Sequence, residues 1–220
     1  MKKYLVTGAN RGIGLELCRQ LKNQGHQVTA VCRTSSPELD ALGVRVIDQC
    51  DVADQSSVQQ LAVRLGDEKI DVLINNAGVL AHNALGEIDY HSVKQQFQVN
   101  AIGPLMVTEA LLPYLAVDAK VAIVTSRMGS MADNDSGGYY GYRMSKAAVN
   151  MAGASLAVDL KPKGIAVVLL HPGYVKTDMT GHNGLVDTQH AASGLLDRIA
   201  QLRIENTGTF WHAEGEQLPW

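Results

Sequence analysis

The sequence predicts an α/β fold of the doubly wound type, in which a parallel sheet of seven strands is covered by helices on both faces. Short apolar segments of strand length alternate along the chain with longer segments of helical periodicity. The strand segments are apolar at successive positions, as in residues 165–170, which indicates strands buried on both faces. Such strands form parallel sheets, and right-handed crossovers through the intervening helices give the doubly wound arrangement.

The elements follow one another in a regular order. The expected strands lie at residues 3–7, 27–32, 44–48, 70–74, 120–125, 165–170 and 208–211. The expected helices cover residues 12–24, 55–65, 89–115, 139–160 and 188–203. The connection between Arg33 and Val44 leaves room for only about one or two turns of helix. No repeat, linker or low-complexity tract interrupts residues 1–220, so we expect a single domain.

Composition narrows the classes of partner. A formal net charge of −3 gives no reason to expect nucleic acid or a membrane surface, because both attract clustered Lys and Arg. Cys18, Cys32 and Cys50 are scattered and odd in number, which favours reduced thiols. The sequence shows no signal-type segment and no apolar run of membrane-spanning length, and its seven His show no metal-ligand spacing. We therefore expect a cytoplasmic protein with small-molecule partners, no membrane contact and no metal site.

A glycine-rich turn joins the first expected strand to the first helix. It contains Gly8, Asn10, Arg11, Gly12, Ile13 and Gly14. Glycines allow the backbone to turn sharply and to approach a pyrophosphate at a helix N-terminus. The spacing is G-x-x-x-G-x-G, and glycines standing alone would also suit an ordinary strand-to-helix turn. We expect this turn to bind a dinucleotide because the rest of the chain offers redox chemistry.

The end of the second expected strand indicates which dinucleotide is bound. Sites that prefer NAD place an acidic residue there to accept hydrogen bonds from the ribose hydroxyl, whereas this chain has Cys32 followed by Arg33. Arg33 and Arg11 can form charge-assisted hydrogen bonds with a 2′-phosphate. Either arginine alone would more simply be a solvated surface charge. Their joint position predicts NADP(H) as the cofactor.

A phenol and an ammonium supply the expected chemistry. Tyr142 and Lys146 stand one helical turn apart, so both side chains can point into one cleft. Carbonyl reduction requires a hydride on carbon and a proton on oxygen, and a nearby ammonium favours phenolate and lowers the pKa of Tyr142. Tyr139 and Tyr140 compete for the donor role, but Tyr139 is followed after four residues by Arg143, which is less suited to proton relay.

A serine is expected beside this phenol. Ser126 follows the fifth strand at the carboxyl edge of the sheet, where doubly wound folds bind ligands, and its hydroxyl can hydrogen-bond a substrate oxygen. Ser130 is the alternative. Ser126 precedes Tyr142 by 16 residues, and the polar loop at residues 131–138 can accommodate this long connection, which favours Ser126.

Four motifs stand in a recognisable order. They are Thr7-Gly8-x-x-x-Gly12-x-Gly14, Asn75-Asn76-Ala77-Gly78, Tyr142-x-x-x-Lys146 and Pro172-Gly173. With them the chain resembles the short-chain dehydrogenase/reductase family over almost its full length, and residues 126–130, 137–140 and 215–220 are similar to its C-factor and sniffer-like carbonyl reductase branch. The resemblance implies a Rossmann-type fold in which Ser126, Tyr142, Lys146 and Asn100 are the catalytic residues.

The resemblance also assigns cofactor-binding residues. Asp51 and Val52 approach the adenine, and Asn76, Ala77 and Gly78 line the adenosine ribose. Pro172, Gly173, Val175 and Thr177 surround the nicotinamide carboxamide, and Lys146 holds the nicotinamide ribose. Asp51 could equally cap the helix that begins near residue 55.

Asn100 has two readings. In the family its backbone carbonyl holds a water that links the catalytic lysine to solvent. The neighbouring Gly103-Pro104 offers a simpler reason for a kink at this point of the helix.

Together these features predict an oxidoreductase that uses NADP(H) to reduce the carbonyl of an aldehyde, ketone or quinone, with Tyr142 as proton donor. The alternative is a non-catalytic NADP(H)-binding signalling or redox-sensor protein. A hydrolase is disfavoured because no G-x-S-x-G pentapeptide occurs. Apolar residues in helices 89–115 and 139–160, and the family resemblance, predict a homodimer or a homotetramer.

Overall fold

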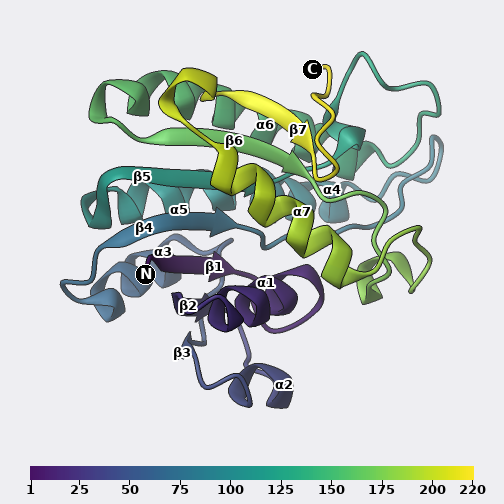
Figure 1. Ribbon diagram of the computed structural model, residues 1–220. Helices are drawn as coiled ribbons and strands as arrows, with labels where there is room; N and C mark the ends of the chain where they lie inside the picture. Colours follow the sequence, from purple (N-terminus) through teal and green to yellow (C-terminus); the bar gives the residue numbers. More distant parts are fainter.

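A seven-stranded parallel sheet forms the centre of the protein (Figure 1). The computed structural model describes residues 1–220. The strands are β1 (Lys3–Thr7), β2 (Gln27–Val31), β3 (Arg45–Ile47), β4 (Ile70–Asn75), β5 (Leu115–Val124), β6 (Ala166–His171) and β7 (Thr209–His212). Their order is β3-β2-β1-β4-β5-β6-β7, and all neighbours are parallel, which confirms the doubly wound prediction. The order reverses between β1 and β4, where such folds bind ligands.

Helices cover both faces of the sheet. They are α1 (Gly12–Asn23), α2 (Pro37–Asp40), α3 (Gln55–Leu65), α4 (Tyr90–Phe97), α5 (Gly103–Leu111), α6 (Tyr140–Leu160) and α7 (Thr188–Gln201). Helices α1 and α7 pack on one face, and α3, α5 and α6 pack on the other (Figure 1). In β5, Ala122 and Val124 point to the first face and Val121 and Ile123 to the second. This alternation explains why residues 121–124 of the strand are all apolar.

The helix expected at residues 89–115 is divided. Helix α4 passes into a π-helical turn at Gln98–Ile102, then into α5 and a 3₁₀ turn at Leu112–Tyr114. Pro104 has no N–H, so it cannot donate to the carbonyl of Asn100 four residues earlier, and the regular ladder is interrupted there. Asn100 therefore lies in the irregular turn, with its carbonyl freed from its normal helical donor.

Strand β5 also differs from the expectation. It begins at Leu115 rather than at residue 120, and its pairing with β4 shifts in register between Leu115 and Lys120. Asp118 takes a positive φ of 59° inside the shifted segment. The short connection after β2 holds the single turn α2, as expected.

The long loops gather at one edge. The segments after β1, β4, β5 and β6 leave from the carboxyl ends of the strands and lie on the same side of the molecule (Figure 1). None of the helices combines the length and apolar character needed to cross a bilayer.

Candidate active site

One cavity of about 850 Å³ runs along this edge. Most of the residues expected to bind cofactor line it: Gly8, Asn10, Arg11, Gly12, Ile13, Gly14, Arg33, Asp51, Val52, Asn76, Ala77, Gly78, Tyr142, Lys146, Pro172 and Thr177. Gly173 and Val175 follow Pro172 but do not line the cavity, and Val175 is buried behind it. Ser126 and Asn100 lie just outside the lining.

The glycine-rich turn leaves no room for side chains. Gly8 has a φ of +67°, and a Cβ on it would stand 2.8 Å from the Cα of Ala77. A Cβ on Gly14 would collide with the carbonyl oxygen of Gly8. The side chain of Asn76 ties the turn in place by donating to the carbonyls of Thr7 (3.0 Å) and Gly8 (3.2 Å). The bare backbone beside the cavity forms a cradle of the kind that fits the pyrophosphate of a dinucleotide.

Thr7 begins the glycine motif, but the sequence did not indicate the role of its hydroxyl. Its Oγ1 accepts hydrogen bonds from the backbone N–H groups of Asn76 (3.1 Å) and Ala77 (3.2 Å). The hydroxyl therefore holds the β4–α4 loop against the glycine turn. These residues come together because β1 pairs with β4, and no local sequence pattern predicts this contact.

The structure shows which aspartate caps α3. Asp54, not Asp51, caps α3 by accepting from the N–H of Ser57 at 2.8 Å. The reading of Asp51 as a helix cap is therefore wrong. Asp51 accepts only a local hydrogen bond from Ala53, at 2.9 Å, and its side chain lines the cavity.

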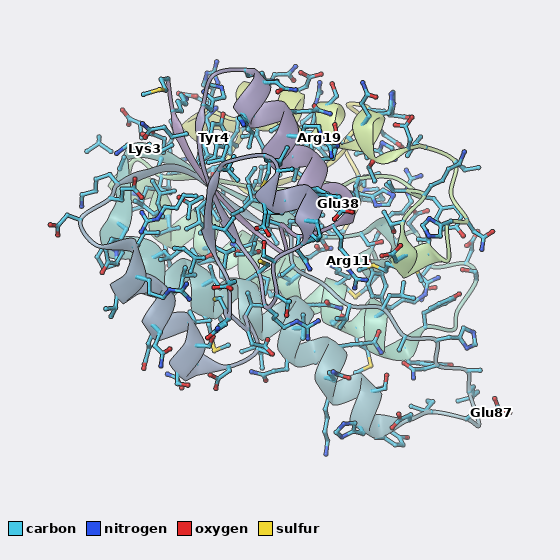
Figure 2. All side chains as sticks on the ribbon, turned by 90° about the horizontal axis from the view of Figure 1, so that it is seen from below. Lys3, Tyr4, Arg11, Arg19, Glu38 and Glu87 are labelled. Carbon is cyan, nitrogen blue, oxygen red and sulfur yellow. The ribbon has the colours of Figure 1, made fainter.

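Arg11 has a partner that the sequence did not indicate. Its guanidinium lies 3.2 Å from the carboxylate of Asp178 on the loop after β6, and both side chains are more than half exposed. Figure 2 shows Arg11 on the side of the molecule where this loop runs. Exposed pairs of this kind contribute at most about 1 kcal/mol, so an anion in the cavity can compete for Arg11.

Tyr142 and Lys146 are buried together at the other end of the cavity. Tyr142 is 8% exposed and Lys146 is 4% exposed. The Nζ of Lys146 lies 5.7 Å from the centroid of the Tyr142 ring and donates to the carbonyl of Val124 at 2.9 Å. Helix α6 therefore places both groups against the end of β5, one turn apart as the spacing predicts.

Burial sets the ionisation of both groups. Burial raises the pKa of Tyr142 to about 12, while a hydrogen bond with Ser126 acts in the opposite direction. Burial lowers the pKa of Lys146 to about 8. The expected depression of the Tyr142 pKa by Lys146 is not found in this structure: loss of hydration around the phenol raises the pKa, and the hydrogen bond with Ser126 is the effect that lowers it.

The two candidate serines have different surroundings. Ser126 interacts with Tyr142 and also accepts from the N–H of Met128 at 3.1 Å. Ser130 instead accepts from the N–H of Asp133 at 3.2 Å and so organises the polar loop. The geometry thus brings Ser126, rather than Ser130, to the phenol.

Asn100 joins the β4–α4 loop to the catalytic helix. Its amide accepts from the N–H of Val79 and donates to the carbonyl of Val79, both at 2.8 Å, and it also donates to Ser145 at 3.0 Å. A Cβ on Gly78 would lie 3.3 Å from the Oδ1 of Asn100 and 3.8 Å from the Nζ of Lys146. Asn100 and Lys146 are therefore neighbours across Gly78.

His171 was also missed from the sequence. It ends β6, its Nδ1 is buried without a partner, and its ring packs edge-on against His212 with centroids 4.9 Å apart. Burial lowers the pKa of His171 to about 3, with the charges of Arg127 and Lys146 acting in the same direction. The residue is neutral at physiological pH, so it adds no positive charge beside the site.

Comparison with known families fits this arrangement. The family model described as short chain dehydrogenase matches residues 2–185. The chain belongs to the short-chain dehydrogenase family. This confirms the family that the four ordered motifs indicate.

Two known members of the family are close in sequence. The chain is 42% identical to the 1-hydroxy-2-glutathionyl-2-methyl-3-butene dehydrogenase of Rhodococcus sp. strain AD45 over 226 residues, covering 100% of both proteins. It is 50% identical to the C-signal protein of Myxococcus xanthus over 154 residues, covering 69% of this chain and 93% of that protein.

Solved structures of the family are similar over the whole chain. The NADPH-bound carbonyl reductase from chicken fatty liver has a TM-score of 0.91 at 29% identity, covering 100% of this short-chain dehydrogenase and 99% of that chain. The carbonyl reductase Sniffer of D. melanogaster has a TM-score of 0.92 at 29% identity, with 100% of both chains covered. These likenesses confirm the resemblance to the C-factor and sniffer-like branch.

Burial of the lysine generates a prediction about stability. The pKa of Lys146 is about 8 in the folded chain against 10.5 for the free side chain, so below about pH 8 a charge stays buried on folding. Replacing it as Lys146→Met should raise the free energy of unfolding near pH 7 by on the order of 3 kcal/mol. The gain should shrink as the pH rises from about 8 toward 10.5, because the wild-type lysine then becomes neutral in the unfolded chain as well.

Urea unfolding of the cofactor-free protein across this pH range measures the effect. Lys161→Met, at an exposed lysine just after α6, is the matched control and should change stability little at any pH. A Lys146→Met protein that is less stable than wild type, or a gain that does not vary with pH, would contradict the prediction.

Proposed function

We propose that this short-chain dehydrogenase uses NADP(H) to reduce the carbonyl of an aldehyde, ketone or quinone to an alcohol. The observation that carries the proposal is the buried Tyr142–Lys146 pair with Ser126, at one end of a cavity whose other end is the glycine cradle. The NADPH-bound carbonyl reductase of chicken supports it, as does the Rhodococcus relative, which is named a dehydrogenase. A non-catalytic sensor would have no use for a phenol, a serine and an ammonium held together in this way.

The cavity suits a pyridine dinucleotide, which when bound supplies the hydride. The glycine turn would receive the pyrophosphate, Asp51 and Val52 would lie beside the adenine, and the segment from Asn76 to Gly78 would lie beside its ribose; all of these residues line the cavity. The loop that would hold the nicotinamide carboxamide contains Pro172 and Thr177, which line the cavity, and Gly173 and Val175, which do not. Arg33 and Arg11 would bind the 2′-phosphate, and the neighbouring Cys32 stands where an acidic side chain would repel that group.

Tyr142 delivers the proton. Its pKa of about 12 keeps the phenol protonated at neutral pH, which is the form needed to protonate a developing alkoxide. Ser126, in contact with Tyr142, donates a hydrogen bond to the same substrate oxygen. The O–H bond of Tyr142 breaks as the O–H bond of the alcohol forms.

Lys146 and Asn100 restore the proton. With a pKa of about 8, Lys146 can gain and lose a proton close to neutral pH. Asn100 lies beside it in the π-helical turn, and the freed carbonyl of Asn100 is available to a solvent molecule. We assign these two residues to the path from solvent to the Tyr142 phenolate.

We infer that the protein forms a homodimer through the outer face of α6. Met144, Met151 and Val158 recur every seven residues on that helix and are 53%, 68% and 71% exposed. Leu105 on the neighbouring α5 is also exposed. Exposed apolar residues aligned along one helix are typical of a subunit contact. The three cysteines are free and buried, which fits the cytoplasmic location that we also propose.

The first test is turnover. The wild-type protein should consume NADPH in the presence of at least one member of a panel of aldehydes, ketones and quinones. Tyr142→Phe should lower kcat by about 10²–10⁴-fold, since it removes the proton donor, while NADPH affinity changes little. Tyr140→Phe is the control and should retain wild-type activity. Tight NADPH binding without any turnover would instead support a sensor.

Cofactor preference is tested separately. The wild-type protein should bind NADPH far more tightly than NADH, and Arg33→Ala should narrow the ratio by about tenfold, the worth of one charge-assisted contact. Fluorescence titration with both nucleotides measures the ratio. Equal affinities in the wild-type protein would refute the assignment of Arg33.

Subunit contact is tested by solution mass. Met151→Glu puts a charge at the centre of the exposed α6 stripe and should convert the dimer to a monomer in light scattering. Val63→Glu, at an exposed apolar position on α3, should leave the dimer intact. A wild-type monomer would refute the proposed contact, and a wild-type tetramer would show that a second surface is also used.

A further inference from the structure

A largely buried polar stripe runs along α4 and the π-helical turn that follows it. Ser92, Gln96 and Asn100 recur every four residues across α4 and the π-helical turn, so they share one face. Gln96 is only 2% exposed. Its Oε1 accepts from the N–H of Ala81 at 3.0 Å, and its Nε2 donates to Asn83 and to Ser92, both at 3.2 Å.

Asn83 reaches the start of the catalytic helix. Helix α6 begins after Tyr139, which has a left-handed backbone (φ 49°, ψ 38°) and offers no side-chain cap. The Oδ1 of Asn83, a residue 2% exposed, accepts from the N–H of Gly141 at 3.3 Å. A side chain 58 residues earlier in the chain therefore satisfies a free N–H in the first turn of α6.

The contact is close-packed. A Cβ on Gly141 would lie 2.6 Å from the Nε2 of Gln96 and 2.9 Å from the Oδ1 of Asn83. The ring of His82, next to Asn83, packs edge-on against Tyr139 with centroids 4.8 Å apart. His82 and Asn83 thus contact the start of α6 from the β4–α4 loop. Further along this loop, Glu87 projects from the molecule (Figure 2).

Two amide anchors hold the catalytic turn. Asn83 binds Gly141, which directly precedes Tyr142. Asn100 binds Ser145, which directly precedes Lys146 and donates in turn to the carbonyl of Tyr142 at 2.8 Å. Tyr142 and Lys146 therefore each follow a residue that is hydrogen-bonded to a side-chain amide. Asn100 belongs to the α4 stripe, and Asn83 is hydrogen-bonded to Gln96 of that stripe.

We infer that Asn83 and Gln96 are positioning residues that fix the Tyr142 hydroxyl for proton delivery. Neither side chain lines the cavity, so both act through the backbone of α6. Hydrogen bonds are directional, and buried amides that satisfy one another permit a single spacing between loop, α4 and α6. A displacement of the phenol by about 1 Å can cost about 10²-fold in rate. This inference rests on the proposed role of Tyr142 as proton donor.

The experiment compares steady-state kinetics of full-length variants with NADPH and the best carbonyl substrate of the panel. Asn83→Ala and Gln96→Leu should each lower kcat by about tenfold or more, with KM for NADPH within about twofold of wild type. Asn83→Asp keeps an oxygen acceptor for both N–H groups and should recover most of the activity. Gln95→Leu, at the exposed neighbouring position on α4, should behave as wild type.

The readouts separate positioning from mere stability. A displaced phenol should also shift the pH at which kcat declines, because the contact of Tyr142 with Ser126 changes. Wild-type kcat and an unmoved pH profile in folded Asn83→Ala and Gln96→Leu, with only a lower melting temperature, would overturn the inference. If Asn83→Ala does not fold, Gln96→Leu decides by the same criteria. Absence of turnover in the wild-type protein would instead refute the proposed function.

Discussion

Burial of the Lys146 ammonium beside the Tyr142 phenol is the constraint around which the site is built. An ammonium in an apolar interior is costly unless it finds acceptors, and here the Val124 carbonyl at the end of β5 provides one. That carbonyl is available because β5 ends at Val124 and the chain turns away toward Ser126. The same strand end thus satisfies the lysine and delivers the serine to the phenol. A buried lysine that weakens the fold is understandable only if its charge is used.

The remaining geometry follows from the parallel sheet. Every strand delivers its carboxyl end to the same edge, so segments distant in sequence meet there without any of them being long. Apolar packing on the two faces sets the layers but is not directional. The amides of Asn83, Gln96 and Asn100 add directional contacts between the β4–α4 loop, α4 and α6, since each is buried and each must find its partners. Local irregularity is placed where it serves this purpose, as in the π-helical turn at Asn100.

Much of this arrangement was predictable from sequence because it rests on local signals. Apolar periodicity placed all seven strands, and the glycines, Arg33 and the Tyr142–Lys146 spacing indicated residues that do line one cavity. The contacts that the sequence did not predict join residues that are far apart along the chain. The contact of Asn83 with Gly141 spans 58 residues, and the pairing of Arg11 with Asp178 spans 167. No window of sequence contains either pair. The recurrence of Ser92, Gln96 and Asn100 at every fourth position was the one available hint of the α4 stripe, and the other polar residues around them hide it.

The direction of the Tyr142 pKa shift was predicted wrongly, because sequence spacing indicates that Lys146 is near but not how far water is excluded from the phenol. Proximity to an ammonium lowers a phenol pKa, whereas exclusion of water raises it, and only the structure shows which effect is larger. With a pKa of about 12 for Tyr142 and about 8 for Lys146, neutral pH leaves the phenol protonated and the lysine mostly charged. Loss of the phenolic proton then creates a phenolate close to a cation in a medium of low dielectric, where their attraction is much stronger than in water. Tyr142 thus stays protonated until negative charge develops on the substrate oxygen, and Lys146 stabilises the phenolate that remains after proton transfer.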